Sequence, residues 1–335
     1  MAQPEPAGAA RRPSQSRVAY LARIARVYAN RSSGPLSFWY EQPRMNEAGF
    51  DGRQYFMTFQ GKAAYAGPFD SDGVPLLDYQ GDIGRQHNPI AVAQYGLARF
   101  NRWCDTTAAD DRTAWLRVAT WLARELTPNR FGVPVWMHHF DWPYREVLQA
   151  PWYSGLAQGN GVSMLVRAAE ATGEARFANA AHKAFESMRL DVSAGGVLVT
   201  DDRRRTWIEE YLVDPPSHIL NGFIWALWGV YDYARWSGAH AASRLFDACV
   251  ATVEQALPEY DTGRWSLYEL PTGGPPMIAS RYYHELHIVQ LRVLERLTDN
   301  PVFGEVASRW QRYLDSPVNR TRALVEKAAF KVLHY

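Results

Sequence analysis

The chain has 335 residues, of which 47% are hydrophobic and 21% charged, and its formal net charge at pH 7 is +1. This composition predicts a sizeable core in one large domain, or in one domain with a smaller one beside it. The near-neutral charge argues against bulk nucleic-acid binding, although a local basic groove for an acidic polymer stays open. The two cysteines, Cys104 and Cys249, do not make a disulfide scaffold, and we expect free thiols in a reducing compartment.

Residues 1–16 are small, polar and proline-rich, and we expect them to form a disordered tail. They lack the apolar segment of a signal peptide, which predicts a cytoplasmic location. Residues 17–29 show a short basic amphipathic pattern, predicted to be a helix packed on the body of the protein; peripheral contact with a membrane stays open. No run approaches the ~20 apolar residues of a membrane span, so we predict no transmembrane segment.

Residues 34–80 are predicted to be irregular and β. Alternation on both sides of Gly61 indicates a hairpin over residues 53–67. Asp70 and Asp72 precede Gly73 as in a calcium loop, but the later ligands of such a loop are missing, and an Asx turn is the better interpretation. Residues 17–80 are therefore expected to form an N-terminal helix and a small β region.

From Asn88 onward the pattern becomes helical. Asn88 is predicted to cap the first helix, and Ser217 to cap a very apolar helix that ends at Gly238. Short β segments are predicted at 195–200 and 263–270. The expected helices cover residues 88–103, 111–127, 153–173, 175–190, 217–238, 242–257, 282–298 and 302–316.

These helices follow one another in sequential pairs. Antiparallel helix hairpins laid side by side can close into an α/α toroid, whose inner helices are apolar nearly all round, as residues 217–236 are. The sequence therefore predicts a mainly α protein, with an incomplete or (α/α)6-like toroid as the catalytic domain at 81–335. Functional residues are expected on the loops at the mouth of the toroid.

The sequence contains no complete motif for binding a metal or a nucleotide. His284 and His287 are three residues apart, whereas the zinc protease motif needs four, and no cysteine or aspartate cluster completes a site. Gly159 and Gly161 follow no predicted strand, which rejects a dinucleotide fingerprint. We predict neither a metal nor a cofactor.

The remaining candidates for a catalytic site are clusters of carboxylates, tyrosines and histidines near loop–helix junctions. They are Glu209–Tyr211, Tyr268 and Arg281–His287. They lack the separated acid pair of a glycosidase, but they suit proton abstraction beside a carboxylate, which needs a base and donors that stabilise an enediolate. A tyrosine can serve if cationic neighbours such as Arg281 or a histidine lower its pKa. The structural alternative stays open: core tyrosines, and Glu210 paired with Arg203–Arg205.

Five segments in the same order, 88–101, 155–168, 209–233, 257–270 and 283–291, resemble the catalytic region of the D-glucuronyl C5-epimerase family, the heparosan and heparan sulfate epimerases. Residues 33–43 also resemble the segment that precedes this region in short microbial members. The resemblance implies a homodimer with a β-rich N-terminal part and an α/α-toroid catalytic domain. It implies inversion of D-glucuronate to L-iduronate within an acidic polysaccharide, by removal of the C5 proton and its return from the opposite face, without nicotinamide.

The family's catalytic residues correspond here to Glu210 and Tyr211, to Tyr268 and to Tyr283. Glu210 and Tyr283 are expected on opposite faces of C5, with Tyr211 and Tyr268 supporting the enediolate. Glu210 is expected to point into the cleft and Glu209 to form a structural ion pair. Because neighbours alternate in an extended chain, Glu210 and Tyr211 can both line the site only if the backbone bends.

Two positions depart from the family pattern. Leu212 replaces a proline, and Pro271 stands where vertebrate members carry an arginine that we link to the substrate carboxylate, so Arg281 or Arg85 is expected to replace it. The short N-terminal region leaves a calcium site and the β contribution to dimerisation open. Further substrate contacts are expected from His87, Asn88, Trp152, Gln158, His284 and His287, with Trp207 as a second stacking surface.

Two other functions stay open. A uronate polysaccharide lyase begins with the same proton abstraction and then expels the C4 oxygen. A glycan-binding protein without activity would keep the cleft but not the chemistry.

Overall fold

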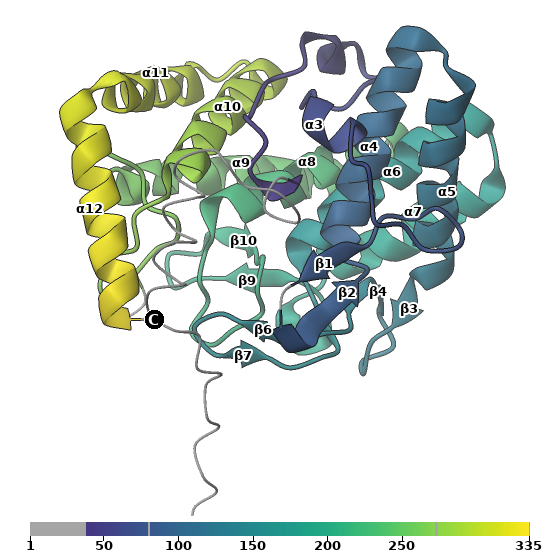
Figure 1. The fold of residues 1–335 in the computed structure, drawn as a ribbon, viewed down its shortest axis with the longest axis horizontal. Coiled ribbons are helices and arrows are strands. Elements are labelled where there is room, and N and C mark those ends of the chain that lie inside the picture. The colour runs from purple at the N-terminus through teal and green to yellow at the C-terminus, as the bar shows by residue number, and fades with distance from the viewer. Residues whose placement is uncertain (1–37, 80, 272–273, 335) are drawn as a thin grey trace, which may run out of the picture.

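The structure is a computed structural model that describes residues 38–79, 81–271 and 274–334, so the expected tail at 1–16 and helix at 17–29 lie outside the described residues. Helices dominate, with short two-stranded sheets between them (Figure 1). The helices are α3 (Gln60–Ala63), α4 (Pro89–Thr106), α5 (Ala109–Glu125), α6 (Gly155–Thr172), α7 (Ala175–Met188), α8 (Leu220–Ser237), α9 (His240–Tyr260), α10 (Arg281–Thr298), α11 (Pro301–Asp315) and α12 (Pro317–His334).

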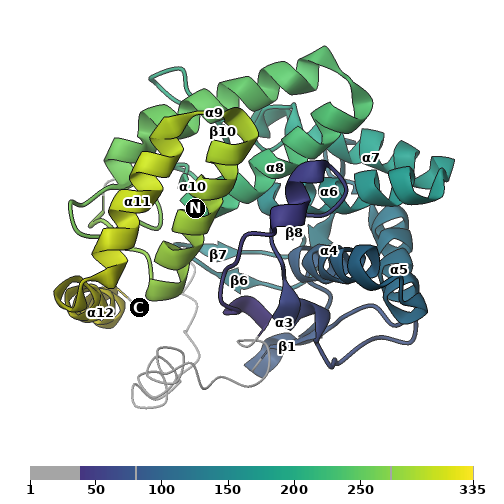
Figure 2. The same ribbon diagram turned by 90° about the horizontal axis from the view of Figure 1, so that it is seen from above.

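Consecutive helices pack as hairpins: α4 with α5, α6 with α7, α8 with α9 and α10 with α11. The first members of these pairs also contact one another in the order α4, α6, α8 and α10, which makes an inner layer with the second members outside it (Figure 2). The prediction of a mainly α, toroid-type fold is confirmed, and the described residues supply four hairpins of an incomplete toroid. Helix α12, which was not predicted, packs on α10 and α11.

The two central helices, α6 and α8, touch through their backbones. A Cβ at Gly159 would lie 2.5 Å from Ala226 Cα, and a Cβ at Gly229 would lie 2.4 Å from the Gly159 carbonyl oxygen. Such a distance admits no side chain, so glycine is required at both positions. The pair Gly159–Gly229 therefore fixes how closely the inner helices approach.

The helix ends follow the predicted capping residues, with one exception. The Asn88 side chain accepts the amide N–H of Ile90, and Gly238 ends α8 in the left-handed region at φ 66°. The exception is Ser217: α8 begins only at Leu220, and the Ser217 N–H and hydroxyl donate to Glu209 instead. The prediction of Ser217 as an N-cap is thus wrong, because a buried carboxylate competes for the same group.

The strands are short antiparallel pairs on the connections. The predicted β segment at 195–200 is confirmed in part as β9 (Leu198–Thr200), which pairs with β10 (Thr206–Ile208). The hairpin expected around Gly61 is wrong, because that glycine lies in α3, and residues 263–270 form only isolated bridges. The other pairs are β1 (Leu77–Tyr79) with β2 (Gly84–Gln86), β3 (Thr127–Pro128) with β4 (Pro134–Val135), β5 (Met137–His138) with β8 (Trp152–Tyr153), and β6 (Trp142–Pro143) with β7 (Val147–Leu148).

The N-terminal part of the described chain packs on the inner helices. The Tyr55 ring stacks on Trp225 of α8 with centroids 6.0 Å apart, so this segment shares the toroid's core. Cys104 and Cys249 are free thiols, as predicted. Among the described residues, no helix has the length and apolar character needed to cross a membrane.

Candidate active site

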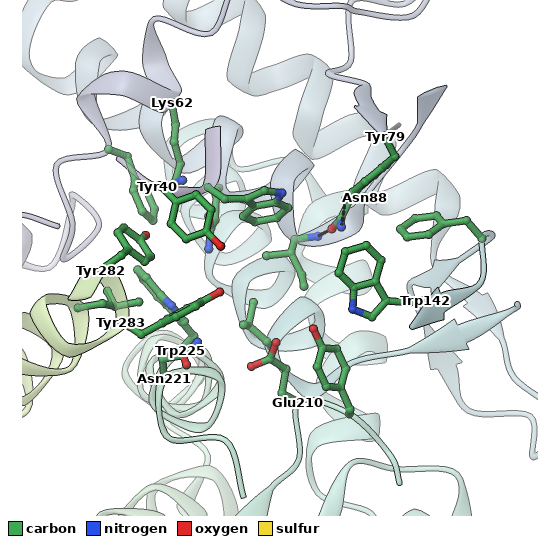
Figure 3. A pocket seen from close by; sticks show the side chains of 18 of the residues that line it. Tyr40, Lys62, Tyr79, Asn88, Trp142, Glu210, Asn221, Trp225, Tyr282 and Tyr283 are labelled. Carbon is green, nitrogen blue, oxygen red and sulfur yellow. Dashed lines mark hydrogen bonds between the residues drawn. The ribbon is translucent and has the colours of Figure 1, made fainter. Parts of the chain in front are cut away.

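All four inner helices begin at one cavity of about 250 Å³ (Figure 3). Its wall includes the first turns of α4, α6, α8 and α10, together with loop residues between the hairpins and a segment from Trp39 to Tyr79. The wall is strongly aromatic, which suits a sugar ring. Its aromatic residues are Trp39, Tyr40, Phe59, Tyr79, Phe140, Trp142, Trp152, Tyr211, Trp225, Tyr282 and Tyr283, and its polar ones include Lys62, Asp78, Asn88, Gln94, Glu210 and Asn221.

Of the two glutamates that follow β10, one lies at the cavity and the other at the backbone before α8. Glu210 lines the cavity. The carboxylate of Glu209 accepts the backbone N–H of Ser217 and of His218, at 3.2 and 3.0 Å, and lies 2.5 Å from His218 Nδ1. The backbone bends at Glu210 and Tyr211, which lets both neighbours line the cavity. The expected assignment of the two carboxylates is therefore found, with His218 as the partner of Glu209.

The Glu210 carboxylate is seated against the first turn of α8. A Cβ at Gly222 would lie 2.1 Å from Glu210 Oε2, so only glycine leaves room for this carboxylate. Oε2 is buried and has no hydrogen-bond partner among the described residues. Burial raises the pKa of Glu210 to about 8, and the nearby charges of Glu269 and Glu209 add to this while hydrogen bonding to Tyr211 opposes it. Glu210 is thus a carboxyl group able to gain or lose a proton near neutral pH.

The three predicted tyrosines gather around Glu210. The rings of Tyr268 and Tyr283 are 4.8 Å apart and edge-on, and Tyr283 lies in the first turn of α10, which Ser280 caps. Burial raises the pKa of Tyr211, Tyr268 and Tyr283 well above 10, and the charge of Glu210 raises all three further. The expectation that cations lower these pKa values is wrong for this structure. The tyrosines are neutral hydroxyl donors, and Tyr268 lies behind Tyr283 rather than on the cavity wall.

A second acidic group supports this cluster and was missed in the sequence. The Tyr144 hydroxyl donates to Glu269, and its ring lies 4.6 Å from that of Tyr211. Arg145 neutralises Glu269 with Nη2 and Oε1 3.1 Å apart. Glu269 directly follows Tyr268, so its anchoring also fixes that tyrosine. The adjacent Tyr-Arg pair in an otherwise irregular segment was the only signal, and nothing in its spacing pointed to residue 269.

Of the predicted substrate-binding residues, Asn88 and Trp152 line the cavity. Asn88 Nδ2 donates to the Tyr79 hydroxyl at 2.8 Å. The Trp152 ring stacks on His138 with centroids 3.8 Å apart and is edge-on to Tyr211. Both side chains are thus held in place at the cavity wall.

The predicted cations and His87 lie elsewhere. The Arg281 side chain is 62% exposed and its Nε is 2.8 Å from Glu285, four residues on along α10. Arg85 is 65% exposed and pairs with Asp78 at 3.2 Å. His87 Nε2 lies 2.9 Å from Asp70, outside the cavity wall. Each of the three side chains has a local acidic partner, and none of them lines the cavity.

The remaining predicted residues are buried and hold the fold together. Gln158 bonds the backbone of Trp136 and Ser154. His284 Nδ1 and His287 Nδ1 both lie within 2.9 Å of the Ser266 hydroxyl, and burial lowers both pKa values, that of His284 to about 4. Trp207 is fully buried against His218 and cannot stack on a sugar. The predictions of these four side chains as substrate contacts are corrected accordingly.

Within the described residues, no group of three or more His, Cys, Asp or Glu side chains could hold a metal ion. Asp70 Oδ1 accepts the backbone N–H of Asp72 and Val74, which is the predicted Asx turn. The Asp70–Gly73 segment is thereby explained without a cation.

One cation of the cavity wall was also missed. Lys62 of α3 is 3% exposed and lines the cavity. Its Nζ lies 4.4 Å from the centre of the Phe38 ring. The hydrophobic residues around it gave no indication in the sequence that a lysine would be buried there.

Sequence comparisons match this chain to one family model and to curated relatives. The family model described as D-glucuronyl C5-epimerase C-terminus matches residues 132–312. A D-glucuronyl C5-epimerase of Caenorhabditis elegans is 30% identical over 215 residues, which are 60% of this chain and 35% of that protein. An uncharacterized protein of Methanocaldococcus jannaschii is 28% identical over 180 residues, 53% of this chain and 57% of that one.

Among solved structures, cellobiose 2-epimerase from Bacillus thermoamylovorans matches with a TM-score of 0.56 over 89% of this chain and 87% of its own. The sequence identity is 10%, so this similarity concerns the fold alone. The chain spans only part of the length of the curated relatives it matches. Since the family model covers more than half of the chain and includes Glu210, Tyr211, Tyr268 and Tyr283, the chain belongs to the D-glucuronyl C5-epimerase family.

Proposed function

We propose that the protein inverts C5 of D-glucuronate to L-iduronate within a heparosan-like polysaccharide. The observation that carries this proposal is the meeting of one buried carboxyl, Glu210, with Tyr211 and Tyr283 at a cavity large enough for a sugar ring, with Tyr268 directly behind Tyr283. The cluster offers one group that can remove a proton near neutral pH and others that can donate one. Epimerisation needs both, because a single base with a fixed substrate returns the same isomer.

The pKa of about 8 at Glu210 suits transfer in both directions. In one direction ionised Glu210 removes the C5 proton, and the electrons of that bond move into the carboxylate to form an enediolate. Tyr283 then donates its proton to C5 from the opposite face and becomes a tyrosinate. In the reverse direction the two groups exchange roles.

Tyr211 and Tyr268 fit a supporting role. Neutral hydroxyls near the developing charge stabilise an enediolate without changing their own ionisation. Their contacts with Glu210 and Tyr283 also offer a path by which the proton on Glu210 returns to a tyrosinate after each turnover. The Tyr144–Glu269–Arg145 group acts as a positioning unit for this pair.

The cavity wall favours an acidic sugar. The first turns of four helices converge there, and helix N-termini carry partial positive charge. Tryptophans such as Trp142 and Trp152 offer apolar faces for neighbouring rings of a polymer. We also propose the homodimer implied by the family resemblance, which light scattering on the purified protein can check.

The test is proton NMR of heparosan, and of an unrelated glucuronate polymer, incubated with the protein in deuterated water. Deuterium should enter at C5 and iduronate signals should appear. Tyr283→Phe should abolish both while polymer binding persists. Tyr233→Phe, which removes a hydroxyl bonded to His182 on the outer side of α8, is the matched control and should stay active.

Other outcomes would replace the proposal. An ultraviolet absorbance from an unsaturated uronate would identify a lyase. Binding of heparosan without C5 exchange would identify a glycan-binding protein. Normal exchange in Tyr283→Phe would remove that residue from the chemistry.

A further inference from the structure

The cavity contains a buried ammonium group that the mechanism above does not use. Lys62 lies in α3, and its Nζ donates to the Phe38 carbonyl oxygen at 2.5 Å. Its stem and head lie among the rings of Phe38, Trp39 and Phe59, with the ammonium 5.3 Å from the centre of the Phe59 ring. These contacts hold the lysine in one place without pairing it with a carboxylate.

Within the described residues, Lys62 has no ion-pair partner. Both oxygens of the nearest acidic side chain, Glu41, accept backbone N–H groups, those of Gly61 and of Lys62 itself. Burial lowers the pKa of Lys62 to about 8, and Glu41 only partly opposes this. An ammonium carries three donors, and the Phe38 carbonyl accepts one of them. A buried cation without an ion-pair partner is costly, which makes a bound anion a natural partner.

The balance of charge in the cavity points the same way. Among the described residues that line it, Lys62 is the only one with a cationic side chain, whereas Glu210 and Asp78 are acidic. Asp78 already pairs with Arg85, which does not line the cavity. Figure 3 shows Lys62 and Glu210 on opposite sides of the cavity, with the Lys62 head directed inward. A sugar between them would meet the base on one side and the ammonium on the other.

We propose that the Lys62 ammonium binds the carboxylate of the uronate whose C5 proton is exchanged, in the role that the sequence had led us to expect of Arg281 or Arg85. This inference rests on the proposed function for the identity of the sugar. An ammonium at the carboxylate holds the ring in register with Glu210 and offsets the charge that accumulates on the enediolate oxygens. It would also make the site select uronates over neutral hexoses.

The test compares two ligands that differ only at C6 of one sugar, which is a carboxylate in one and a hydroxymethyl group in the other. One is a trisaccharide with a single central glucuronate between two glucosamine residues, and the other is its carboxyl-reduced form with glucose at the centre. Binding of both is measured by calorimetry for the wild-type protein, Lys62→Met, Lys62→Arg and Lys327→Met. Lys327 is a matched control for ligand binding, because it is also buried and donates to a backbone carbonyl, that of Ile278, but does not line the cavity. It is not a control for C5 exchange, since its ammonium lies 5.6 Å from the centre of the Tyr268 ring.

The wild-type protein should bind the glucuronate form about tenfold to a hundredfold more tightly than the reduced form. Lys62→Met should lose this preference and keep its affinity for the reduced form, whereas Lys62→Arg and Lys327→Met should keep most of the preference. Equal weakening of both ligands by Lys62→Met, or a preference that survives it, would overturn the proposal. Circular dichroism confirms that each variant is folded.

C5 exchange, measured on the same samples, separates this inference from the proposed function. If the preference depends on Lys62 but the wild-type protein exchanges no C5 proton, the carboxylate site stands and the epimerase proposal fails. If exchange occurs and is the same in Lys62→Met, the epimerase proposal stands and Lys62 is excluded. Absence of binding of either ligand to the wild-type protein would contradict both.

Discussion

Glu210 should make the protein less stable as the pH rises, and Glu210→Gln should remove this effect. The carboxyl is buried, its Oε2 has no hydrogen-bond partner among the described residues, and burial raises its pKa to about 8. The folded state therefore binds this proton more tightly than the unfolded chain does. Stability from this group is fully present below the unfolded pKa near 4.5 and is lost as the pH rises through about 8.

The magnitude follows from the two pKa values. A rise from 4.5 to about 8, at ~1.4 kcal/mol for each factor of ten in proton affinity, amounts to ~5 kcal/mol of unfolding free energy. Most of this should be lost between about pH 5 and pH 8. A glutamine has nearly the same shape and no ionisation, so the variant should become more stable than the wild-type protein as the pH rises.

The assay is urea unfolding of both proteins at several pH values between about 5 and 9, with the free energies extrapolated to water. The difference between wild type and Glu210→Gln should grow with pH and level off above about 8. Glu209→Gln is the control: it weakens bonds to the backbone of Ser217 and His218, so it should destabilise the protein. It should also retain most of the pH slope, because burial contributes more to the raised pKa of Glu210 than the charge of Glu209 does. Parallel curves for wild type and Glu210→Gln would refute the reasoning.

Three further outcomes are expected. Gly222→Ala would place a Cβ 2.1 Å from Glu210 Oε2, so C5 exchange in deuterated water should fall about a hundredfold while circular dichroism stays unchanged. Gly229→Ala would force a Cβ against the Gly159 carbonyl and should cost ~1–3 kcal/mol of stability in urea unfolding, because α6 and α8 must separate. The pH profile of kcat/KM should rise to about pH 8 as Glu210 ionises and fall above it as Lys62 loses its proton, since the two pKa values are both about 8. In Lys62→Arg, kcat/KM should still rise to about pH 8 but should no longer fall above it. A wild-type kcat/KM that does not change with pH would contradict the assignment of the rise to Glu210 and of the fall to Lys62.

The parts of the molecule that could be predicted from the sequence depend on local rules. Helix ends at Asn88 and Gly238 follow from capping residues, and the opposite directions of Glu209 and Glu210 follow from alternation along an extended chain. The position of Arg281 also follows from a local rule, the pairing of opposite charges four residues apart on a helix. Glu285 lies four residues after it on the same helix, and such a pair holds the guanidinium on the helix surface.

The rest depends on contacts between distant segments. The capping role predicted for Ser217 fails because the Glu209 carboxylate, eight residues earlier, takes its donors. Lys62 is held at the cavity by aromatic rings and by the Phe38 carbonyl oxygen. Its neighbours in sequence do not predict that its side chain is buried. A lysine in a four-residue helix resembles any surface lysine until the tertiary structure is known.

One part of the cavity lining lies inside the range matched by the family model, and the other part lies outside it. The groups proposed to move the proton, Glu210 and Tyr283 among them, lie inside the matched range 132–312, whereas Lys62, Asp78 and the other lining residues of the segment from Trp39 to Gln94 lie outside it. The family model thus includes the residues proposed to move the proton and does not extend to Lys62. Exchanging residues 38–88 between relatives should therefore change glycan selectivity while Glu210, Tyr283 and the other proposed catalytic residues stay the same.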